Sequence, residues 1–434
     1  MSNPPFARRF LGGLWLGGLA TAALALVGAP WPPPLDAGLL AHVSGLLAGY
    51  LAAVMLVLMS RTPALETRVG SDVLARWHAR GGRLFLGLVS AHAGAAVQAW
   101  AATRQQDLAT SLVGVLGLPW LLAATAGTAL FVAIAVASVR AARRALAYET
   151  WHGIHLLAYA AISLSFVHEL AGPNLAGRPV LQVLWTLMHA YPLALVLRYR
   201  VLAPLVDIGR HRLRVEAVVP EADGVVSLIM HGRHLEELGA EAGQFFRWRF
   251  LTASTWRAAH PFSLSAPPTR DRLRITVKAL GDGSSLVHSV RPGTLVLAEG
   301  PSGALTAHRR TRRSVLLVAG GVGITPMRAL FETLDIGDGR LTLLYRASSP
   351  GDVVFRTELE HIAWRRGAEI VWMVGPSSAP ALRMTGENLR RLVPDVADRD
   401  VYLCASPGLS AAVRTALQDV GLPRRRLHEE VFAF

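Results

Sequence analysis

Six long apolar segments in the first 200 residues constrain the fold of this chain more than any other feature. Each is near the ~20 residues that an α-helix needs to cross the hydrocarbon core of a bilayer. Because lipid offers the backbone no hydrogen-bond partner, segments of this length predict membrane-spanning helices. The predicted spans are residues 10–29, 38–60, 78–100, 119–139, 151–170 and 180–198.

Arginines flank these spans unevenly, and the imbalance predicts how the spans are oriented. One set of loop ends carries Arg8, Arg9, Arg61, Arg68, Arg76, Arg80, Arg83, Arg140, Arg143 and Arg144. The opposite loops carry Arg104 and Arg178. Since cytoplasmic loops are enriched in Arg and Lys, both termini of this multi-pass protein are predicted to be cytoplasmic. The heavy use of Ala, Arg and Leu favours a bacterium, so the predicted location is the bacterial plasma (inner) membrane.

The first span also has the outline of a signal peptide. Arg8 and Arg9 precede an apolar stretch that ends in small residues near Gly28 and Ala29. Cleavage there would leave five spans and would put one terminus on the wrong side of the membrane. We therefore expect the first span to be retained.

The net charge of +14 does not by itself indicate a nucleic-acid-binding protein. Much of this charge comes from arginines beside the spans, where anionic lipid headgroups attract it, and anionic cofactors would use it as well. We expect membrane lipid as a partner, and no nucleic acid. The single cysteine, Cys404, excludes an internal disulfide and fits a reducing compartment.

Histidines are unusual inside apolar spans, because an unpartnered imidazole costs free energy in hydrocarbon. The third span carries His78 and His92, fourteen residues apart, and the fifth carries His155 and His168, thirteen residues apart. These separations are about 21 Å and about 19.5 Å along an α-helix. Both helices run outward from the cytoplasm in the predicted orientation, so each span supplies one histidine at each of two matched depths.

Two imidazoles at each of two depths match the ligands of two stacked haems, because each haem iron can take one axial imidazole on each face. We expect His78 and His155 to form an inner pair, nearer the cytoplasm, and His92 and His168 to form an outer pair, each pair holding one haem b. His152 competes for the inner position. It lies sixteen residues from His168, about 24 Å along the helix, which is a poorer match in depth.

One geometric difficulty accompanies this prediction. Thirteen residues of ideal helix rotate a side chain about 140° from its starting face, so the fifth span has to twist, tilt or bend for both histidines to reach the third span. His42 and His189 stand alone in the second and sixth spans. For these two we expect ordinary hydrogen bonds to neighbouring helices.

From residue 206 onward the sequence changes to short strands broken by glycine and proline. The segments "RLRVEAVVP", "VVSLIM", "LRITVKAL" and "TLVLAEG" predict a small antiparallel β-barrel over residues 206–308. In residues 309–434, "SVLLVAGG", "RLTLLYRAS", "EIVWMV" and "DVYLCASP" alternate with helical stretches, which predicts a parallel α/β sheet. With residues 1–205 as the membrane bundle, the chain has three predicted domains.

A glycine-rich turn follows the first strand of the predicted α/β domain. In "SVLLVAGGVGITPMRALFETL" an apolar strand leads through Gly320 to Gly323 into a helix that starts near Pro326. Glycines let the backbone approach a pyrophosphate closely, and the helix N-terminus favours its negative charge. The spacing is not the GxGxxG fingerprint, so this turn alone indicates nucleotide binding only weakly.

The combination of motifs is more specific than any one of them. A six-span domain with paired histidines, then "HPFS", "GGVGITP" and a C-terminal "HEEVFAF", resembles the ferric reductase and NADPH oxidase superfamily. The cytoplasmic half of that superfamily is similar to ferredoxin–NADP reductase. The resemblance covers nearly the whole chain, and it implies that the barrel binds FAD and that the α/β domain binds NAD(P)H.

Carried over residue by residue, the resemblance implies three groups of cofactor-binding residues. The flavin motif corresponds to His260, Pro261, Phe262 and Ser263. The segment that holds the FAD pyrophosphate corresponds to Lys278, Gly283, Ser284 and Ser285. The cradle of the nicotinamide nucleotide corresponds to Gly320, Gly321, Gly323, Thr325 and Pro326. Tyr345 and Arg346 would meet the adenosine ribose or its 2′-phosphate, or else form an exposed loop pair.

The resemblance also implies that Ser263, Cys404 and Phe434 lie where hydride is transferred. Ser263 would lie near the reactive flavin nitrogen, and Phe434 would cover the flavin until the nicotinamide displaces it. A terminal aromatic can equally be a core residue. Two departures affect this region: the family's CGP turn reads "CASP" here, and its GPYG segment reads "GPSG", with Ser302 in place of an aromatic.

The implied function is that of a transmembrane oxidoreductase. Cytoplasmic NAD(P)H would reduce FAD, and electrons would then pass singly through two haems b to a small extracytoplasmic acceptor, either a ferric chelate or O₂. One alternative is a haem-bearing membrane subunit that passes electrons to a protein partner. Another is a membrane transporter with a regulatory nucleotide-binding domain.

Overall fold

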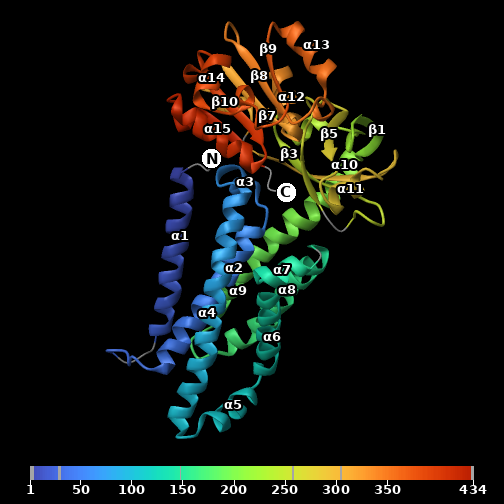
Figure 1. The fold of residues 1–434 in the computed structure, drawn as a ribbon. Helices are drawn as coiled ribbons and strands as arrows, with labels where there is room; N and C mark the ends of the chain where they lie inside the picture. Colours follow the sequence, from blue (N-terminus) through green and yellow to red (C-terminus); the bar gives the residue numbers. More distant parts are fainter. Residues whose placement is uncertain (1–3, 28–30, 147, 257–258, 304, 432–434) are drawn as a thin grey trace. The chain divides into compact units, whose positions relative to one another are not determined.

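The computed structural model describes residues 4–27, 31–146, 148–256, 259–303 and 305–431. The chain divides into two compact units, residues 2–203 and residues 204–434. The first unit is helical, and the second contains the described strands (Figure 1).

The first unit, called the membrane unit below, is a bundle of long helices. Within the described residues six helices are long and apolar enough to cross a membrane: Phe6–Leu26, Ala37–Met59, Val73–Arg104, Leu121–Ser138, Thr150–Ala171 and Pro179–His211. This confirms the six predicted spans. Large apolar side chains such as Leu16, Leu122 and Val180 are mostly exposed. Exposed side chains of this kind suit contact with hydrocarbon, and the chain is a multi-pass membrane protein.

The helices of this unit run in a simple order along the chain. They are α1 (Pro4–Ala23), α2 (Ala37–Met59), α3 (Pro63–Arg68), α4 (Ser71–Arg104), α5 (Leu108–Leu116), α6 (Leu121–Ser138), α7 (Arg140–Ala145), α8 (Tyr148–Ala171) and α9 (Pro179–Val196). A π-helical segment, Leu197–Leu202, follows α9, and α10 (Ala203–His211) begins the second unit.

Polar residues at the loops explain where several helices begin. The Asp36 carboxylate accepts a hydrogen bond from the Leu39 N–H at the start of α2, and the Asp107 carboxylate accepts from the Ala109 and Thr110 N–H groups at the start of α5. Such caps satisfy amide groups that have no partner within the helix. Helix α5 was not predicted, because its nine residues are too few to give a membrane-span signal.

The second unit begins with the predicted antiparallel barrel. Its strands are β1 (Arg214–Ala222), β2 (Val225–His231), β3 (Phe245–Phe250), β4 (His260–Ser263), β5 (Arg272–Lys278) and β6 (Val296–Ser302), with helix α11 (Asp282–Val287) between the last two. They form two three-stranded sheets, ordered β1-β2-β5 and β4-β3-β6. Single bridges between Arg214 and Leu295 and between Leu264 and Ile275 join the sheets. Alternate residues such as Phe246, Trp248 and Phe250 fill the interior.

The α/β lobe follows the barrel. Its elements are β7 (Val315–Gly320), α12 (Ile324–Thr333), β8 (Leu341–Ala347), α13 (Arg356–Arg366), β9 (Glu369–Val374), α14 (Gly386–Leu392), β10 (Asp400–Ala405), α15 (Pro407–Asp419) and β11 (Leu427–Val431). The strands are all parallel, in the order β11-β10-β7-β8-β9. One apolar core lies under α12 and α13, and another lies under α14 and α15. The sheet is therefore covered on both faces (Figure 1).

The barrel and the α/β lobe pack into one body. Leu305, in the connection between them, belongs to the same core as strands β7 and β8. The Tyr402 hydroxyl donates a 3.0 Å hydrogen bond to the Thr306 carbonyl, and a side chain on Gly243 of the barrel would overlap the Leu305 carbonyl. These contacts fix the two lobes against each other around a continuous core.

A buried carboxylate at the start of β10 organises one edge of this sheet. Asp400 is fully buried, and its Oδ2 atom accepts 2.5 Å hydrogen bonds from the N–H groups of Thr311 and Arg312. Its Oδ1 atom accepts from the Thr311 hydroxyl at 3.0 Å.

We expect Asp400→Asn to destabilise the second unit by about 2–4 kcal/mol, because the amide can offer acceptor lone pairs on one side only and loses the charge. This corresponds to a fall of roughly 5–10 °C in the unfolding midpoint. Thermal unfolding of the purified chain in detergent measures it, with Asp398→Asn at an exposed neighbouring position as the control. Equal midpoints for the two variants would contradict the assigned role of Asp400.

Candidate functional site

Four histidines meet in two pairs inside the membrane unit. The ring centroids of His78 and His155 are 5.8 Å apart, and those of His92 and His168 are 6.1 Å apart. The members of each pair come from α4 and α8, and the partners are those expected from their depths. Two imidazoles that bind one metal ion from opposite sides, with metal–nitrogen bonds of roughly 2 Å, have centroids roughly 6 Å apart.

The outer pair is oriented by backbone carbonyls. His92 Nδ1 lies 2.8 Å from the Ala41 carbonyl oxygen of α2, and His168 Nδ1 lies 2.5 Å from the Ser165 carbonyl oxygen in its own helix. An imidazole whose Nδ1–H donates to a carbonyl keeps its Nε2 lone pair available, which is the usual arrangement of a metal-binding histidine.

The inner pair holds polar atoms that need a partner. His78 Nδ1 and His155 Nδ1 are buried, and neither has a hydrogen-bond partner among the described residues. Trp151 stacks on the His155 ring at a centroid distance of 5.2 Å, and His152 lies beside Trp151. The ring that contacts His78 is therefore that of His155, while His152 contacts the tryptophan.

Helix α8 reaches both partners without a break. It is a continuous α-helix from Tyr148 to Ala171. His155 and His168 point about 140° apart on such a helix, so each can reach α4 if the direction toward α4 lies between them, about 70° from each. The twist or bend expected from the sequence is not needed.

A cavity of about 350 Å³ surrounds the outer pair. Its walls are almost entirely apolar, and small residues dominate the side contributed by α2: Ala41, Gly45, Ala48, Gly49 and Ala52. A Cβ atom on Gly45 would lie 2.6 Å from His92 Nδ1, and one on Gly49 would lie 2.7 Å from the Trp185 ring. Small residues on α2 therefore keep open the space beside the histidines.

Sequence reasoning missed one polar group that lines this cavity. The Glu169 carboxylate accepts a 2.7 Å hydrogen bond from Trp185 Nε1, and it lies 3.7 Å from His189 Nε2. His189 is buried, and its Nδ1 lies 3.1 Å from the Trp185 carbonyl, as expected for a histidine bound to its own bundle. A carboxylate next to His168 within an apolar span was the signal that could have revealed this cluster. His42 also lines the cavity.

Within the described residues, no group of three or more His, Cys, Asp or Glu side chains could hold a metal ion. The paired imidazoles thus offer two protein ligands at each level. Two axial ligands are the number that a porphyrin-bound iron takes from a protein, since the macrocycle supplies the other four.

The flavin motif forms strand β4 of the barrel. His260 and Phe262 stack with centroids 6.1 Å apart, and Trp248 Nε1 donates a 2.8 Å hydrogen bond to the Phe262 carbonyl. Ser263 is almost fully buried, and its hydroxyl has no hydrogen-bond partner among the described residues. A buried hydroxyl of this kind is suited to bind an atom that arrives with a ligand.

The predicted pyrophosphate segment lies beside this strand. A Cβ atom on Gly283 would lie 2.5 Å from the His260 ring, so glycine is required for helix α11 to approach β4. The Ser284 hydroxyl accepts hydrogen bonds from the Leu280 and Gly281 N–H groups and so shapes the turn, whereas Ser285 is exposed. Lys278 Nζ forms a 3.1 Å ion pair with Asp352 of the α/β lobe.

The glycine-rich turn is packed against the end of β10. Gly320 ends β7, Gly321 has a φ of +53°, and a short 3₁₀ turn leads into α12. A side chain on Gly323 would overlap the Cys404 carbonyl, so the two loops touch through their backbones. The Thr325 hydroxyl donates to the Val322 carbonyl at 3.0 Å, and Pro326 is buried in the first turn of α12.

Three predicted site residues have environments that limit their roles. Tyr345 is fully buried, burial raises its pKa to about 12, and its hydroxyl accepts a hydrogen bond from the Val354 N–H. The expectation that Tyr345 meets an adenosine ribose is therefore wrong for this conformation, because β8 is buried on both faces. Arg346 is also buried, and it donates to the Met373 carbonyl at 3.1 Å and the Ser377 hydroxyl at 3.0 Å.

Cys404 is also fully buried, and burial raises the pKa of its thiol well above the usual value. Its side chain is thus a neutral core group, and it is the backbone of Cys404 that faces the glycine-rich turn. Phe434 lies outside the described residues.

Two family models match the chain. Residues 44–166 match the ferric reductase like transmembrane component, and residues 317–415 match the oxidoreductase NAD-binding domain. The first range contains His78, His92 and His155 and ends shortly before His168. The second range contains the glycine-rich turn and Cys404.

Curated relatives resemble part of the chain. The ferredoxin reductase component of a 3-ketosteroid-9-alpha-monooxygenase from Mycolicibacterium smegmatis is 30% identical over 240 residues, which are 52% of this chain and 67% of that protein. A flavohemoprotein from Vibrio cholerae is 32% identical over 190 residues, 41% of this chain and 48% of that protein. The chain thus spans about half to two thirds of the length of these relatives.

Among solved structures, the flavohem-like FAD/NAD-binding domain of a nitric oxide dioxygenase from Vibrio cholerae is 26% identical, with a TM-score of 0.44. The match covers 51% of this chain and 98% of that one. With its six membrane helices, its barrel and its parallel α/β lobe, the chain belongs to the ferric reductase and NADPH oxidase superfamily, as a multi-pass membrane oxidoreductase with an FAD- and NAD(P)H-binding module.

Proposed function

We propose that the chain passes electrons from cytoplasmic NAD(P)H through FAD and two bis-histidine haems b to an acceptor on the opposite side of a bacterial plasma membrane. The observation that carries this proposal is the pairing of His78 with His155 and of His92 with His168 inside one helical bundle. The two pairs are separated by about 20 Å along the helices, a large part of the ~30 Å hydrocarbon core.

The side chains around these pairs support haem as the bound group. The inner pair has buried Nδ1 atoms without a partner among the described residues, and the outer pair borders an apolar cavity kept open by small residues. Both features suit a flat, apolar macrocycle that supplies its own equatorial ligands. The arginines at one set of helix ends support cytoplasmic termini.

Within the second unit, the chain's own residues would bind and orient the cofactors. When bound, FAD accepts two electrons from NAD(P)H and releases them singly, and haem iron carries single electrons. Phe262 and Ser263 would position the flavin, and the turn Gly320–Gly323 would hold the nicotinamide nucleotide with Gly323 against the Cys404 backbone. No acid or base from the protein is needed for this transfer.

Anaerobic spectroscopy tests the electron route. NADPH or NADH added to the purified, haem-replete chain should produce the reduced haem bands to the same extent as dithionite. Reduction of the flavin without reduction of haem, or the absence of a Soret band after haem-replete expression, would refute the proposal.

Two histidines of α8 give a matched test of the inner site. We expect His155→Ala to lower the haem content from two to one per chain, because a single imidazole cannot hold the iron on both faces. His152→Ala, three residues away in the same helix, should keep two. Haem extraction and assay against protein concentration measures both, and loss of haem from the His152 variant would exchange the two assignments.

The glycine beside His92 gives a test of the outer cavity. Gly45→Val would push a side chain into the His92 ring, so we expect it to remove the outer haem and leave the inner one. Gly87→Val on α4 has open space around it and is the control. The same haem assay, combined with reduced-minus-oxidised spectra, reads both variants. A Gly45 variant with its full haem content would argue against this position for the macrocycle.

The contact between Gly323 and Cys404 tests the nucleotide site. Gly323→Ala displaces one loop from the other, and we expect flavin reduction by NAD(P)H to slow about ten-fold or more, since misplacement by 1 Å can cost 10²-fold. FAD content should not change. Gly408→Ala, where a Cβ meets nothing within 4 Å, serves as the control in stopped-flow measurements. Equal rates for the two variants would place the nicotinamide elsewhere.

The acceptor is a ferric chelate or O₂ in this proposal. Superoxide production and ferric-chelate reduction by the purified chain, measured side by side, distinguish them. Several relatives are described as a reductase component or subunit, which favours as a second candidate the transfer of electrons to a protein partner. Co-purification of a stoichiometric extracytoplasmic protein would support that candidate.

A further inference from the structure

One face of strand β5 is turned toward the α/β lobe. Arg274, Thr276 and Lys278 alternate along this strand and share that face. Arg274 forms an ion pair with Glu358 of α13, and Lys278 forms one with Asp352 in the loop before α13. Two cationic side chains of the barrel thus hold two carboxylates of the other lobe.

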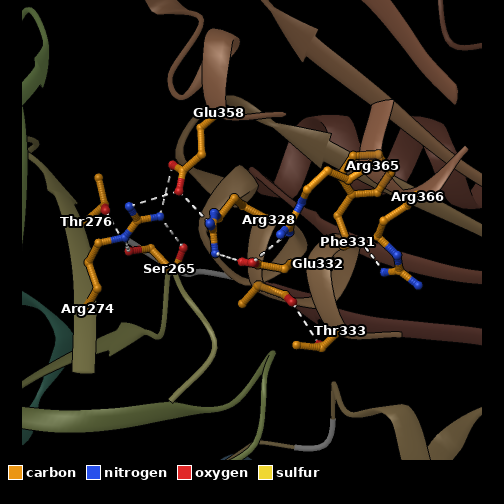
Figure 2. A network of polar contacts seen from close by, with 11 residues as sticks. Ser265, Arg274, Thr276, Arg328, Phe331, Glu332, Thr333, Glu358, Arg365 and Arg366 are labelled. Atoms are coloured by element: carbon orange, nitrogen blue, oxygen red, sulfur yellow. Dashed lines mark hydrogen bonds and ion pairs between the residues drawn. The ribbon is translucent and has the colours of Figure 1, made fainter. Parts of the chain in front are cut away.

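Arg274 uses all the nitrogens of its guanidinium in this contact. Its two terminal nitrogens donate to the two Glu358 carboxylate oxygens at 3.2 Å each, and one of them also donates to the Ser265 carbonyl at 2.7 Å. Nε donates to the Ser265 hydroxyl at 3.2 Å. A two-pronged Arg–carboxylate pair fixes direction as well as distance (Figure 2).

The contact continues to helix α12 through Arg328. This side chain is only 7% exposed, and it pairs with Glu358 on one side and with Glu332 at 2.7 Å on the other. Arg365 of α13 also reaches Glu332, at 3.2 Å (Figure 2). Glu358 therefore joins the barrel to the helix that begins at the glycine-rich turn.

The backbone before α13 is shaped to present both carboxylates. Phe355, immediately before the helix, has a φ of +63° although it is not glycine, and its side chain is buried. Arg274 lies over its ring at 4.8 Å. A left-handed conformation at a bulky residue persists only where the surroundings impose it, and here it lets Asp352 and Glu358 both face β5.

The barrel end of this chain of contacts begins next to the flavin motif. Ser265 follows Ser263 by two residues, and its hydroxyl accepts a 2.8 Å hydrogen bond from the buried Thr276 hydroxyl. Ser265 N–H donates to the Arg274 carbonyl at 2.8 Å. Three side chains, Arg274, Glu358 and Arg328, thus connect the flavin strand to α12.

We propose that this set, the Arg274–Glu358–Arg328 clamp, is a positioning device that fixes the nicotinamide-binding turn relative to the flavin strand and thereby sets the geometry of hydride transfer. The inference rests on the proposed function for the identity of the step. In that step one hydride, with two electrons, leaves NAD(P)H to give NAD(P)⁺ and converts FAD to its two-electron-reduced anion. None of the clamp residues touches the transferred hydride.

The test uses the full-length chain and three variants: Arg274→Gln, Arg274→Lys and Glu358→Gln. The lysine variant keeps the charge but lacks the two-pronged geometry, and it remains available if the glutamine variant does not accumulate. Glu360→Gln is the matched control, because Glu360 lies on the same helix and pairs only at the surface with Arg356, at 3.2 Å. Each protein is assayed for FAD content and for the rate constant of flavin reduction at saturating NADPH or NADH.

A second measurement reports the geometry directly. Cysteines introduced at the exposed positions Arg291 of the barrel and Trp364 of α13 can be spin-labelled selectively, because the native Cys404 is fully buried. We expect the clamp variants to reduce flavin about ten-fold or more slowly, to retain FAD, and to broaden the label-to-label distance distribution. The double variant Arg274→Gln/Glu358→Gln should be no slower than the slower single variant.

Three outcomes would overturn the clamp: rates equal to that of Glu360→Gln, slower rates with an unchanged distance distribution, or loss of FAD in proportion to the loss of rate. The last outcome would indicate a merely structural role. Failure of the proposed electron route looks different, because haem would then stay oxidised in the wild-type chain while its flavin is reduced normally.

Discussion

An imidazole inside a bilayer requires a binding partner, and this requirement organises the membrane unit. Four histidines come to two levels of one bundle, with carbonyls of Ala41 and Ser165 turning the outer rings and buried nitrogens at the inner rings. The stripe of small residues on α2 then has a clear purpose, since larger side chains would fill the space beside the rings. Charge handling in the lipid thus depends on leaving room as much as on supplying ligands.

The second unit meets a different requirement, which is to hold two lobes in one geometry. An apolar core runs from the barrel connection into the sheet, and it excludes water without fixing direction. Direction comes from polar contacts, among them the backbone approach of Gly323 to Cys404 and the ion pairs of β5. Such contacts are sensitive to small displacements, whereas apolar packing tolerates them.

Much of this architecture could be predicted from the sequence, because it follows from local patterns. Apolar length predicts the six spans, strand and glycine patterns predict the barrel and the α/β lobe, and helix rise predicts which histidines share a depth. What could not be predicted depends on partners far apart in sequence. The burial of Tyr345, the link from Glu169 to Trp185 and the ion pair of Arg274 with Glu358 leave no periodic signal, since each depends on how elements pack.

The single cysteine has a consequence for a protein that handles electrons next to oxygen. Cys404 is enclosed at the end of β10, and the protonated thiol is a poor nucleophile. The chain therefore has no accessible sulfur that peroxide could oxidise to a sulfenic acid, and no second cysteine with which to close a bridge. Oxidants formed near this protein find no thiol through which to switch it off.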